Sequence, residues 1–261
     1  MIKPYVFQDT SKKFYKKGSA FYRFVKFWVW FFTPKLEALG VENLPDGPCI
    51  IAGNHSHMMG PIAAELYIPK YRFSWCIAEM LHREEVASYA FQDFWSGKPK
   101  WTHWFYKLLS HIIAPLSVEL LGNAYTVGVY KDRRVLQTFK ESVEKMQDGA
   151  SMVIFPECYD EHNNIVHEFQ RGFVDVAKMY YRQTKESVPF VPMYVCPKLK
   201  KIIFGQPIYY DPDRNKKEET ERICNHLMDQ ISEIAYALPL HTVVPYPNIP
   251  KRDYPSSARP N

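Results

Sequence analysis

The chain of 261 residues is long enough to bury one substantial hydrophobic core, and α/β folds of this length are often single domains. A formal net charge of +5 is too small to indicate nucleic-acid binding, and no stacking platform or base-reading motif accompanies the lysines. The five cysteines are scattered, without the spacing of metal ligands or of a redox pair. We therefore expect a reduced, cytosol-facing environment, no bound metal and no nucleic-acid partner.

Residues 1–34 form a basic and aromatic segment, which begins without the apolar core of a signal peptide. Up to residue 35 the only acid is Asp9, and the basic residues are Lys3, Lys12, Lys13, Lys16, Lys17, Arg23, Lys26 and Lys35. The apolar run after Lys26 is far shorter than the roughly 20 residues that cross a bilayer. In a helix, one face would carry Phe21, Phe24, Val25, Trp28, Phe31 and Phe32. This pattern favours a helix lying peripherally on the cytoplasmic face of a membrane; the alternative is a helix packed on the core.

Strand-like and helix-like segments alternate through residues 35–238. We expect strands at 48–52, 74–78, 151–155, 188–195 and 201–204, and helices at 61–67, 134–147, 172–182 and 218–237. Residues 101–121 should be partly helical with a break near Pro115, and residues 158–168 should form a polar loop. The alternation predicts an α/β domain in which helices flank a mainly parallel or mixed sheet. The proline-rich tail at 239–261 is expected to be an extended arm or disordered.

Two polar motifs each follow an expected strand. Asn54-His55-Ser56-His57-Met58-Met59-Gly60 comes after the first strand, and Phe155-Pro156-Glu157 closes the strand at 151–155. Residues just past the carboxyl ends of strands share one crevice in an α/β sheet, so His55 and Glu157 are expected to meet there. A His and a Glu delivered to one crevice by separate strands predict an active site.

The order of these motifs resembles the glycerolipid acyltransferase family, which includes the 1-acylglycerol-3-phosphate acyltransferases. The family's first motif, Asn-His-x-x-x-x-Asp, is matched by Asn54 and His55, with Gly60 in place of the Asp. Its third motif, Phe-Pro-Glu-Gly-Thr-Arg, is matched at 155–157 and then departs to Cys158-Tyr159-Asp160. The other matching segments, over a resemblance that covers residues 35–237, are Gly128-Val129-Tyr130-Lys131-Asp132-Arg133, Phe169-Gln170-Arg171-Gly172, Val188-Pro189-Phe190-Val191-Pro192-Met193 and Phe204-Gly205-Gln206-Pro207-Ile208.

The resemblance implies a phospholipid-biosynthesis enzyme that moves a fatty acyl group from an acyl-CoA or acyl carrier protein thioester to a hydroxyl of a lysophospholipid or related glycerolipid. His55 would be the general base, because the unperturbed pKa of His lies near neutrality. No cofactor, metal or covalent enzyme intermediate is implied. By resemblance, Glu157 positions the acceptor; the alternative for this residue is the cap of a helix or loop. The candidates for binding the acceptor's phosphate are Lys131, Arg133 and Arg171.

Gly60 stands where the family has an Asp that orients the catalytic His, and several interpretations remain open. Asp160 supplies the carboxylate in the first. In the second, His55 works unassisted or through a backbone carbonyl, at a lower rate. In the third, catalysis is lost and a lipid- or acyl-thioester-binding protein remains. A hydrolase of acyl thioesters, in which water replaces the acceptor, is a further alternative.

Asp160 also stands where the family has an Arg that helps to hold the acceptor's phosphate. A carboxylate there would repel a dianion, so either basic residues elsewhere bind the phosphate or the acceptor is a different hydroxyl or amine compound. Two minor alternatives are a thiol nucleophile at Cys158 and a zinc site built from His55 and His57 with His162, His167 or Cys158.

Overall fold

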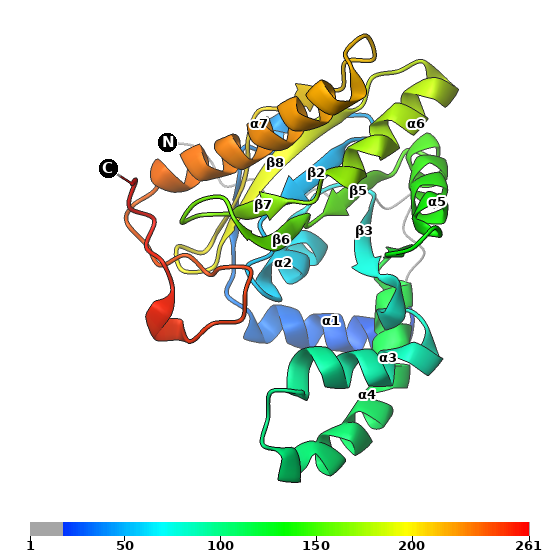
Figure 1. Ribbon diagram of the computed structural model, residues 1–261, viewed down its shortest axis with the longest axis vertical. Coiled ribbons are helices and arrows are strands. Elements are labelled where there is room, and N and C mark those ends of the chain that lie inside the picture. Colours follow the sequence, from blue (N-terminus) through cyan, green and yellow to red (C-terminus); the bar gives the residue numbers. More distant parts are fainter. Residues whose placement is uncertain (1–17, 261) are drawn as a thin grey trace.

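A mostly parallel β-sheet forms the centre of the molecule, in a computed structural model that describes residues 18–260 (Figure 1). Within those residues the main sheet has eight strands, in the order β1-β9-β8-β2-β5-β3-β4, with β10 paired to β8. Their bounds are β1 Glu37–Leu39, β2 Ile50–Gly53, β3 Arg72–Ile77, β4 Thr126–Val129, β5 Ser151–Ile154, β8 Pro189–Cys196, β9 Lys201–Phe204 and β10 Ile208–Tyr209. The lysines that the sequence places before residue 18 lie outside the described residues.

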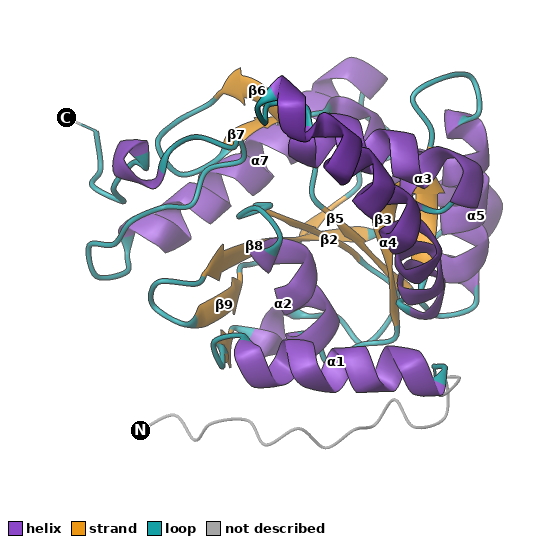
Figure 2. Ribbon diagram, turned by 90° about the horizontal axis from the view of Figure 1, so that it is seen from below, coloured by secondary structure: helices purple, strands orange, loops and turns teal. Residues whose placement is uncertain are grey.

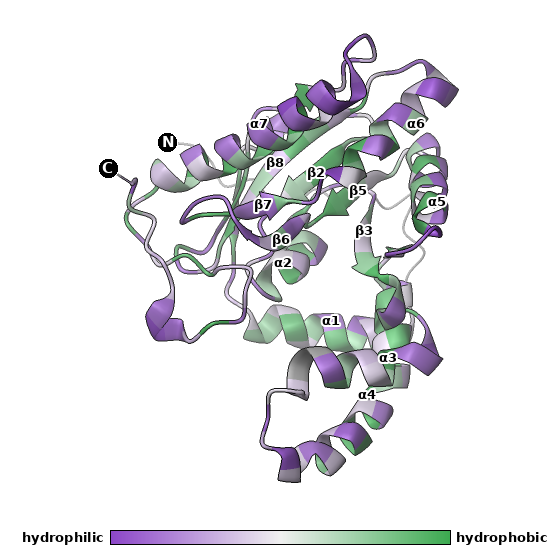
Figure 3. Cartoon of the chain, in the orientation of Figure 1, coloured by the Kyte–Doolittle hydropathy of each residue, from purple (hydrophilic) through white to green (hydrophobic). Residues whose placement is uncertain are grey.

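The central strands β2, β5 and β8 are parallel and completely buried, as expected for continuous apolar runs covered on both faces (Figure 3). Ala52 of β2 pairs with Ile154 of β5, so these two strands end side by side. β9 and β10 run antiparallel to β8, which makes the sheet mixed at that side. The register therefore brings the residues that follow β2 and β5 to one edge of the sheet.

Helices cover both faces of the sheet (Figure 2). Ile50, Ala52 and Ile154 face the larger cluster of core residues, which also includes residues of α5 (Val135–Gln147), α6 (Asp175–Thr184) and α7 (Lys216–Tyr236). The intervening Ile51 and Val153 face a second cluster with α2 (Met59–Tyr67). The alternation follows from the two-residue period of a strand, in which successive side chains point to opposite faces.

Two helices at the lower end of Figure 1 carry large apolar side chains that are exposed to solvent. α1 (Ala20–Phe32) has no buried residue, and Phe24, Phe31 and Phe32 are each more than half exposed. α4 (His103–Asn123) packs on α3 (Arg83–Ala90), while the exposed residues on or just before α4 include Trp101, Trp104, Phe105, Leu108, Ile112 and Leu116. Among the described residues, no helix combines the length and apolarity required to cross a membrane.

Two segments differ from the sequence-based expectation. α4 continues through Pro115, because Ala114 before the proline and Val118 after it both pack on α3. The expected polar loop at 158–168 contains a two-stranded hairpin, β6 (Glu157–Glu161) and β7 (His167–Phe169). Short helices complete the chain: η2 Val41–Asn43, η3 Ala78–Met80, a π-turn at Phe91–Trp95, η5 Lys100–Thr102, η6 Arg171–Val174 and η7 Lys251–Asp253.

Candidate active site

The turn that carries His55 lies between β2 and α2. Asn54 at its start is buried, and its side-chain amide exchanges two hydrogen bonds with the main chain of Val195, at 2.7 and 3.1 Å. Two residues of the turn, Ser56 and His57, have a left-handed backbone conformation, with φ of +45° and +51°. Two successive non-glycine residues in this region are uncommon, and their strain persists only where surrounding contacts fix the backbone.

The backbone of this turn provides a partner for the His55 ring. The Nδ1 atom of His55 lies 2.5 Å from the carbonyl oxygen of His57. A carbonyl oxygen can only accept a hydrogen bond, so Nδ1 carries a hydrogen atom and is the donor of this bond. In the neutral imidazole the lone pair then resides on Nε2, the nitrogen that a general base uses. The carbonyl of His57 thus sets the tautomer, a function that a carboxylate has in a Ser-His-Asp triad.

Gly60 is packed so closely that no side chain fits there. A Cβ atom at this position would lie 2.4 Å from the backbone oxygen of His55 and 2.8 Å from that of Asn54. It would also approach Phe155 to 2.8 Å. The amide of Gly60 donates a 2.9 Å hydrogen bond to the same His55 oxygen. The glycine is therefore part of the turn's geometry, and an Asp at this position is incompatible with the turn as it stands.

Glu157 joins the two predicted motifs. It begins β6 and is only 3% exposed. One carboxyl oxygen accepts a 2.5 Å hydrogen bond from the amide of His55, and the other accepts a 3.0 Å bond from the amide of His167. Burial raises the pKa of Glu157 to about 7, although both backbone hydrogen bonds act in the opposite direction. Glu157 fixes the His55 backbone to the β6–β7 hairpin; its predicted contact with an acceptor stays a prediction.

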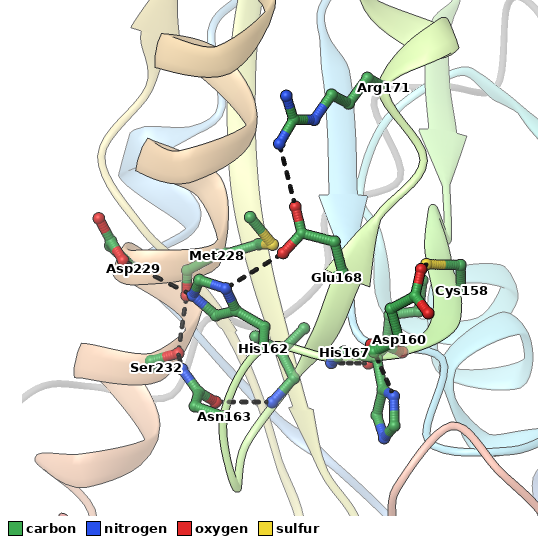
Figure 4. Close-up of polar contacts among 12 residues, drawn as sticks. Cys158, Asp160, His162, Asn163, His167, Glu168, Arg171, Met228, Asp229 and Ser232 are labelled. Carbon is green, nitrogen blue, oxygen red and sulfur yellow. Dashed lines mark hydrogen bonds and ion pairs between the residues drawn. The ribbon is translucent and has the colours of Figure 1, made fainter.

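Asp160 lies on the exposed part of β6. Its carboxylate accepts a 3.8 Å hydrogen bond from the thiol of Cys158, and its backbone carbonyl accepts a 3.1 Å bond from Nδ1 of His167 (Figure 4). Because Nδ1 of His55 already donates to the carbonyl of His57, that nitrogen has a backbone partner in place of the carboxylate predicted from Asp160. A part for Asp160 in catalysis stays a prediction.

The three basic residues proposed for phosphate binding lie in two places. Lys131 and Arg133 are exposed in the loop after β4, two strands away from β5 and about 10 Å from it at ordinary strand spacing. Arg171 pairs with Glu168 at 3.4 Å and with Glu221 of α7 at 3.1 Å. Figure 4 shows Arg171 on the α7 side of the hairpin, away from Asp160. The structure therefore does not gather the three cations beside His55.

Aromatic rings contact His55 from two directions. Phe155 lies 5.4 Å from it between ring centroids, and Tyr246, from the proline-rich tail, lies 5.7 Å away. No motif in the sequence points to Tyr246 or to the carbonyl of His57. Gly60 indicates close backbone approach in this turn, but the oxygens that approach it are those of Asn54 and His55.

The histidines near the hairpin have other partners than a metal. His162 contacts Glu168 at 3.3 Å and Asp229 at 3.9 Å, and His167 contacts the main chain of Asp160. Among the side chains that the structure describes, no group of three or more His, Cys, Asp or Glu is arranged to hold a metal ion.

Comparison with known proteins decides the family. The sequence profile of the acyltransferase family matches residues 35–196, more than half of the chain and a range that contains both the His55 and the Glu157 motifs. The chain belongs to the acyltransferase family. Among solved structures it is similar to the 1-acyl-sn-glycerophosphate (LPA) acyltransferase PlsC from Thermotoga maritima, with a TM-score of 0.48 and 16% identity over 84% of this chain and 78% of that chain. No curated protein matches the chain at a significant level.

Proposed function

We propose that this member of the acyltransferase family transfers a fatty acyl group from a thioester, on coenzyme A or acyl carrier protein, to a hydroxyl of a lysophospholipid or similar glycerolipid, with His55 as the general base. The observation that carries the proposal is the hydrogen bond from Nδ1 of His55 to the carbonyl oxygen of His57. It leaves the basic nitrogen, Nε2, as the atom that receives a proton.

The reaction needs only proton transfer and direct attack. Nε2 of His55 takes the proton of the acceptor hydroxyl while the oxygen attacks the thioester carbonyl carbon. The resulting tetrahedral intermediate collapses, the carbon–sulfur bond breaks, and the proton on Nε2 passes to the leaving sulfur. The products are an ester and a free thiol, and the imidazole regains its initial state.

A backbone carbonyl supports this cycle less well than a carboxylate. Both fix the tautomer, but a neutral carbonyl stabilises the transient imidazolium less than a full negative charge does. Loss of the orienting Asp lowers kcat by about 10⁴-fold in a serine protease, where it also disturbs the tautomer. Here the tautomer is kept by His57, so the expected loss of rate relative to an enzyme with a carboxylate is smaller.

A membrane surface is the proposed location of the acceptor, at the cytoplasmic face. The exposed aromatic rings of α1 and α4 support this, since such rings occupy the headgroup region of a bilayer. Lys98, Lys100 and Lys107 lie in or next to the exposed part of α4, where they suit anionic headgroups. An apolar groove of about 400 Å³ lies between α1 and Ile62 of α2 and offers space for a lipid tail. Ile62 follows Gly60 by two positions in the sequence.

The decisive experiment compares the wild type with His55→Ala in detergent micelles. Each protein is incubated with labelled acyl-CoA or labelled acyl carrier protein, and with lysophosphatidic acid, neutral lysolipids or water alone. His111→Ala, an exposed His on α4, is the matched control and should behave as the wild type. We expect acyl ester from the wild type and a decrease of at least about a hundredfold in His55→Ala.

The other outcomes identify the alternatives. Release of fatty acid with water alone, at the same rate with or without an acceptor, would make the protein a thioester hydrolase. Binding of acyl-CoA without turnover by either protein would make it a lipid- or thioester-binding relative, in which Gly60 marks lost catalysis.

A further inference from the structure

Residues 239–260, here called the C-terminal arm, are fixed to the body of the protein at their base. His241 is buried, and its Nε2 lies 2.8 Å from the hydroxyl of Tyr194 on β8. Ser257, also buried, contacts Nδ1 of His241 at 2.9 Å. The amide of Val243 donates to the carbonyl of Pro255, so the arm returns along itself. Figure 1 shows it in red and orange beside α7 and the β6–β7 hairpin.

The middle of the arm contacts the His55 ring and the third motif together. The ring of Tyr246 lies 5.7 Å from that of His55 and 5.3 Å from that of Tyr159 on β6. It also lies 6.2 Å from the ring of His167. Tyr246 is half-buried among these rings. One side chain of the arm therefore bridges the two motif segments that Glu157 joins through the backbone.

A second contact of the arm falls on His57. The carbonyl oxygen of Pro247 lies 3.3 Å from Nε2 of His57, which donates to it, and the ring of Tyr254 meets the His57 ring at 5.9 Å. His57 is the left-handed residue whose carbonyl accepts the hydrogen bond from His55. An unfavourable backbone conformation requires outside support, and at His57 the arm provides it on the side chain.

We propose that the C-terminal arm is part of the active site, with Tyr246 as a specificity-determining residue that forms a wall of the acceptor site beside His55. The arm holds the His57 turn, and through it the orientation of the imidazole. Its Tyr246 ring also gives an acceptor an apolar surface to contact beside His55, and an acceptor that binds there displaces water from the imidazole. This inference rests on the proposed transferase activity.

The arm lies outside the part of the chain that the acyltransferase profile matches. The acyltransferase profile ends at residue 196, well before the arm begins. By the resemblance described above, Gly60 stands where the family has its orienting carboxylate, and Cys158-Tyr159-Asp160 stand where it has Gly-Thr-Arg. The arm contacts the segments that carry both departures: the His57 turn next to Gly60, and Tyr159 of the altered third motif.

The test separates acyl transfer from hydrolysis. Tyr246→Ala, Tyr246→Phe and the control Tyr209→Ala, an exposed residue of β10, are assayed with acyl thioester and an acceptor that the wild type uses. For Tyr246→Ala we expect a three- to tenfold rise in the acceptor KM, about the effect of one lost aromatic contact, with an unchanged donor KM. The fraction of acyl groups lost to water should rise as well. Tyr246→Phe keeps the ring and should retain the wild-type partition.

If Tyr246 had a structural role alone, its replacement would not change the partition of acyl groups between the acceptor and water. If Tyr246→Ala melts well below the wild type, Tyr246→Leu keeps a larger apolar side chain without the ring, and the partition is measured on that variant. An unchanged partition and an unchanged acceptor KM in a folded variant would overturn the proposal.

A measurement without turnover keeps the inference separate from the proposed function. Long-range proton–nitrogen NMR spectra of histidine-labelled protein report which ring nitrogen of His55 is protonated, with the signal assigned by its loss in His55→Ala. We expect the Nδ1–H tautomer in the wild type and a mixture of tautomers in Tyr254→Ala. If the wild type transfers no acyl group, the proposed function fails, and the NMR spectrum still tests whether the arm supports the His57 turn. An unchanged tautomer of His55 in Tyr254→Ala would refute that support.

Discussion

The carboxylate of Glu157 accepts a hydrogen bond from the amide of His55, 102 residues earlier in the chain, at 2.5 Å. This contact exists because β2 and β5 are neighbours in register, with Ala52 beside Ile154. Each residue lies three positions past its strand partner. A single buried side chain thereby holds the predicted base in place relative to the third motif.

The buried carboxyl of Glu157 should make stability depend on pH. Its pKa is raised from 4.5 to about 7, so between these values the folded chain holds a proton that the unfolded chain has released. The stabilisation is therefore present at low pH and is lost as the pH rises through about 7. The total decrease in the free energy of unfolding across this pH range is on the order of 3 kcal/mol.

Urea unfolding of the wild type and Glu157→Gln between pH 5 and 8 tests this. The variant has no group at position 157 that titrates in this pH range. It also loses one of the two hydrogen bonds from backbone amides, because the side-chain NH₂ of Gln cannot accept a hydrogen bond. We expect the difference in free energy of unfolding, wild type minus variant, to fall as the pH rises. A difference that stays constant or grows with pH would contradict the raised pKa.

Gly60→Asp should damage the protein instead of restoring a catalytic carboxylate. A Cβ at 2.4 Å from the His55 oxygen displaces the turn, and we expect a loss of about 2 kcal/mol or more in free energy of unfolding. Activity should fall as well. Gly122→Ala is the matched control: nothing lies within 4 Å of its Cβ, and in a helix it should stabilise slightly. Higher turnover in Gly60→Asp would show that the turn can open to admit a carboxylate.

Asp160→Asn tests whether the partner of His55 in catalysis is the Asp160 carboxylate or the backbone carbonyl of His57. If Asp160 stabilised the His55 imidazolium, removing its charge would cost up to about 10⁴-fold in kcat. Because Nδ1 of His55 donates to the carbonyl of His57, we expect a loss of less than about tenfold, measured as kcat at saturating donor and acceptor. A loss of a thousandfold with unchanged melting would instead assign the relay to Asp160.

The exposed rings of α1 should drive binding to lipid vesicles. Phe31 and Phe32 are 56% and 76% exposed, and each buried Phe contributes about 1.5–3 kcal/mol. The double variant Phe31→Ser/Phe32→Ser should partition into anionic vesicles at least about tenfold more weakly than the wild type in a sedimentation assay. Leu136→Ser removes an equally exposed apolar residue from α5 and should have no effect. Equal weakening by both changes would argue against a specific role for α1.

The α/β fold, the expected strands and the meeting of His55 with Glu157 could all be predicted from sequence. Buried parallel strands are apolar runs, and the polar residues that end them fall at one edge of the sheet. The hairpin at β6 and β7 was not predictable, because Cys158 to Glu161 lies largely in solvent and lacks alternation of polar and apolar residues. The continuity of α4 through Pro115 was missed because packing on α3 outweighs the local cost of a proline.

The details of the site depend on contacts that local sequence does not encode. Tyr246 reaches His55 from the arm that follows α7, and the arm is held at its base by the buried contact between His241 and Tyr194. The interaction of Nδ1 with the His57 carbonyl depends on two left-handed residues, neither of them a glycine. Phosphate binding by Arg171 stays a prediction, and its pairing with Glu221 depends on the position of α7, which the local sequence does not encode.

The close packing around Gly60 makes the residue type at this position and the shape of the turn depend on each other. The glycine and the turn suit each other, because backbone oxygens occupy the space that any side chain would need. A single substitution at position 60 therefore strains the turn, whichever side chain is introduced. A side chain at this position and the present path of the backbone exclude one another, so a carboxylate there requires a different turn.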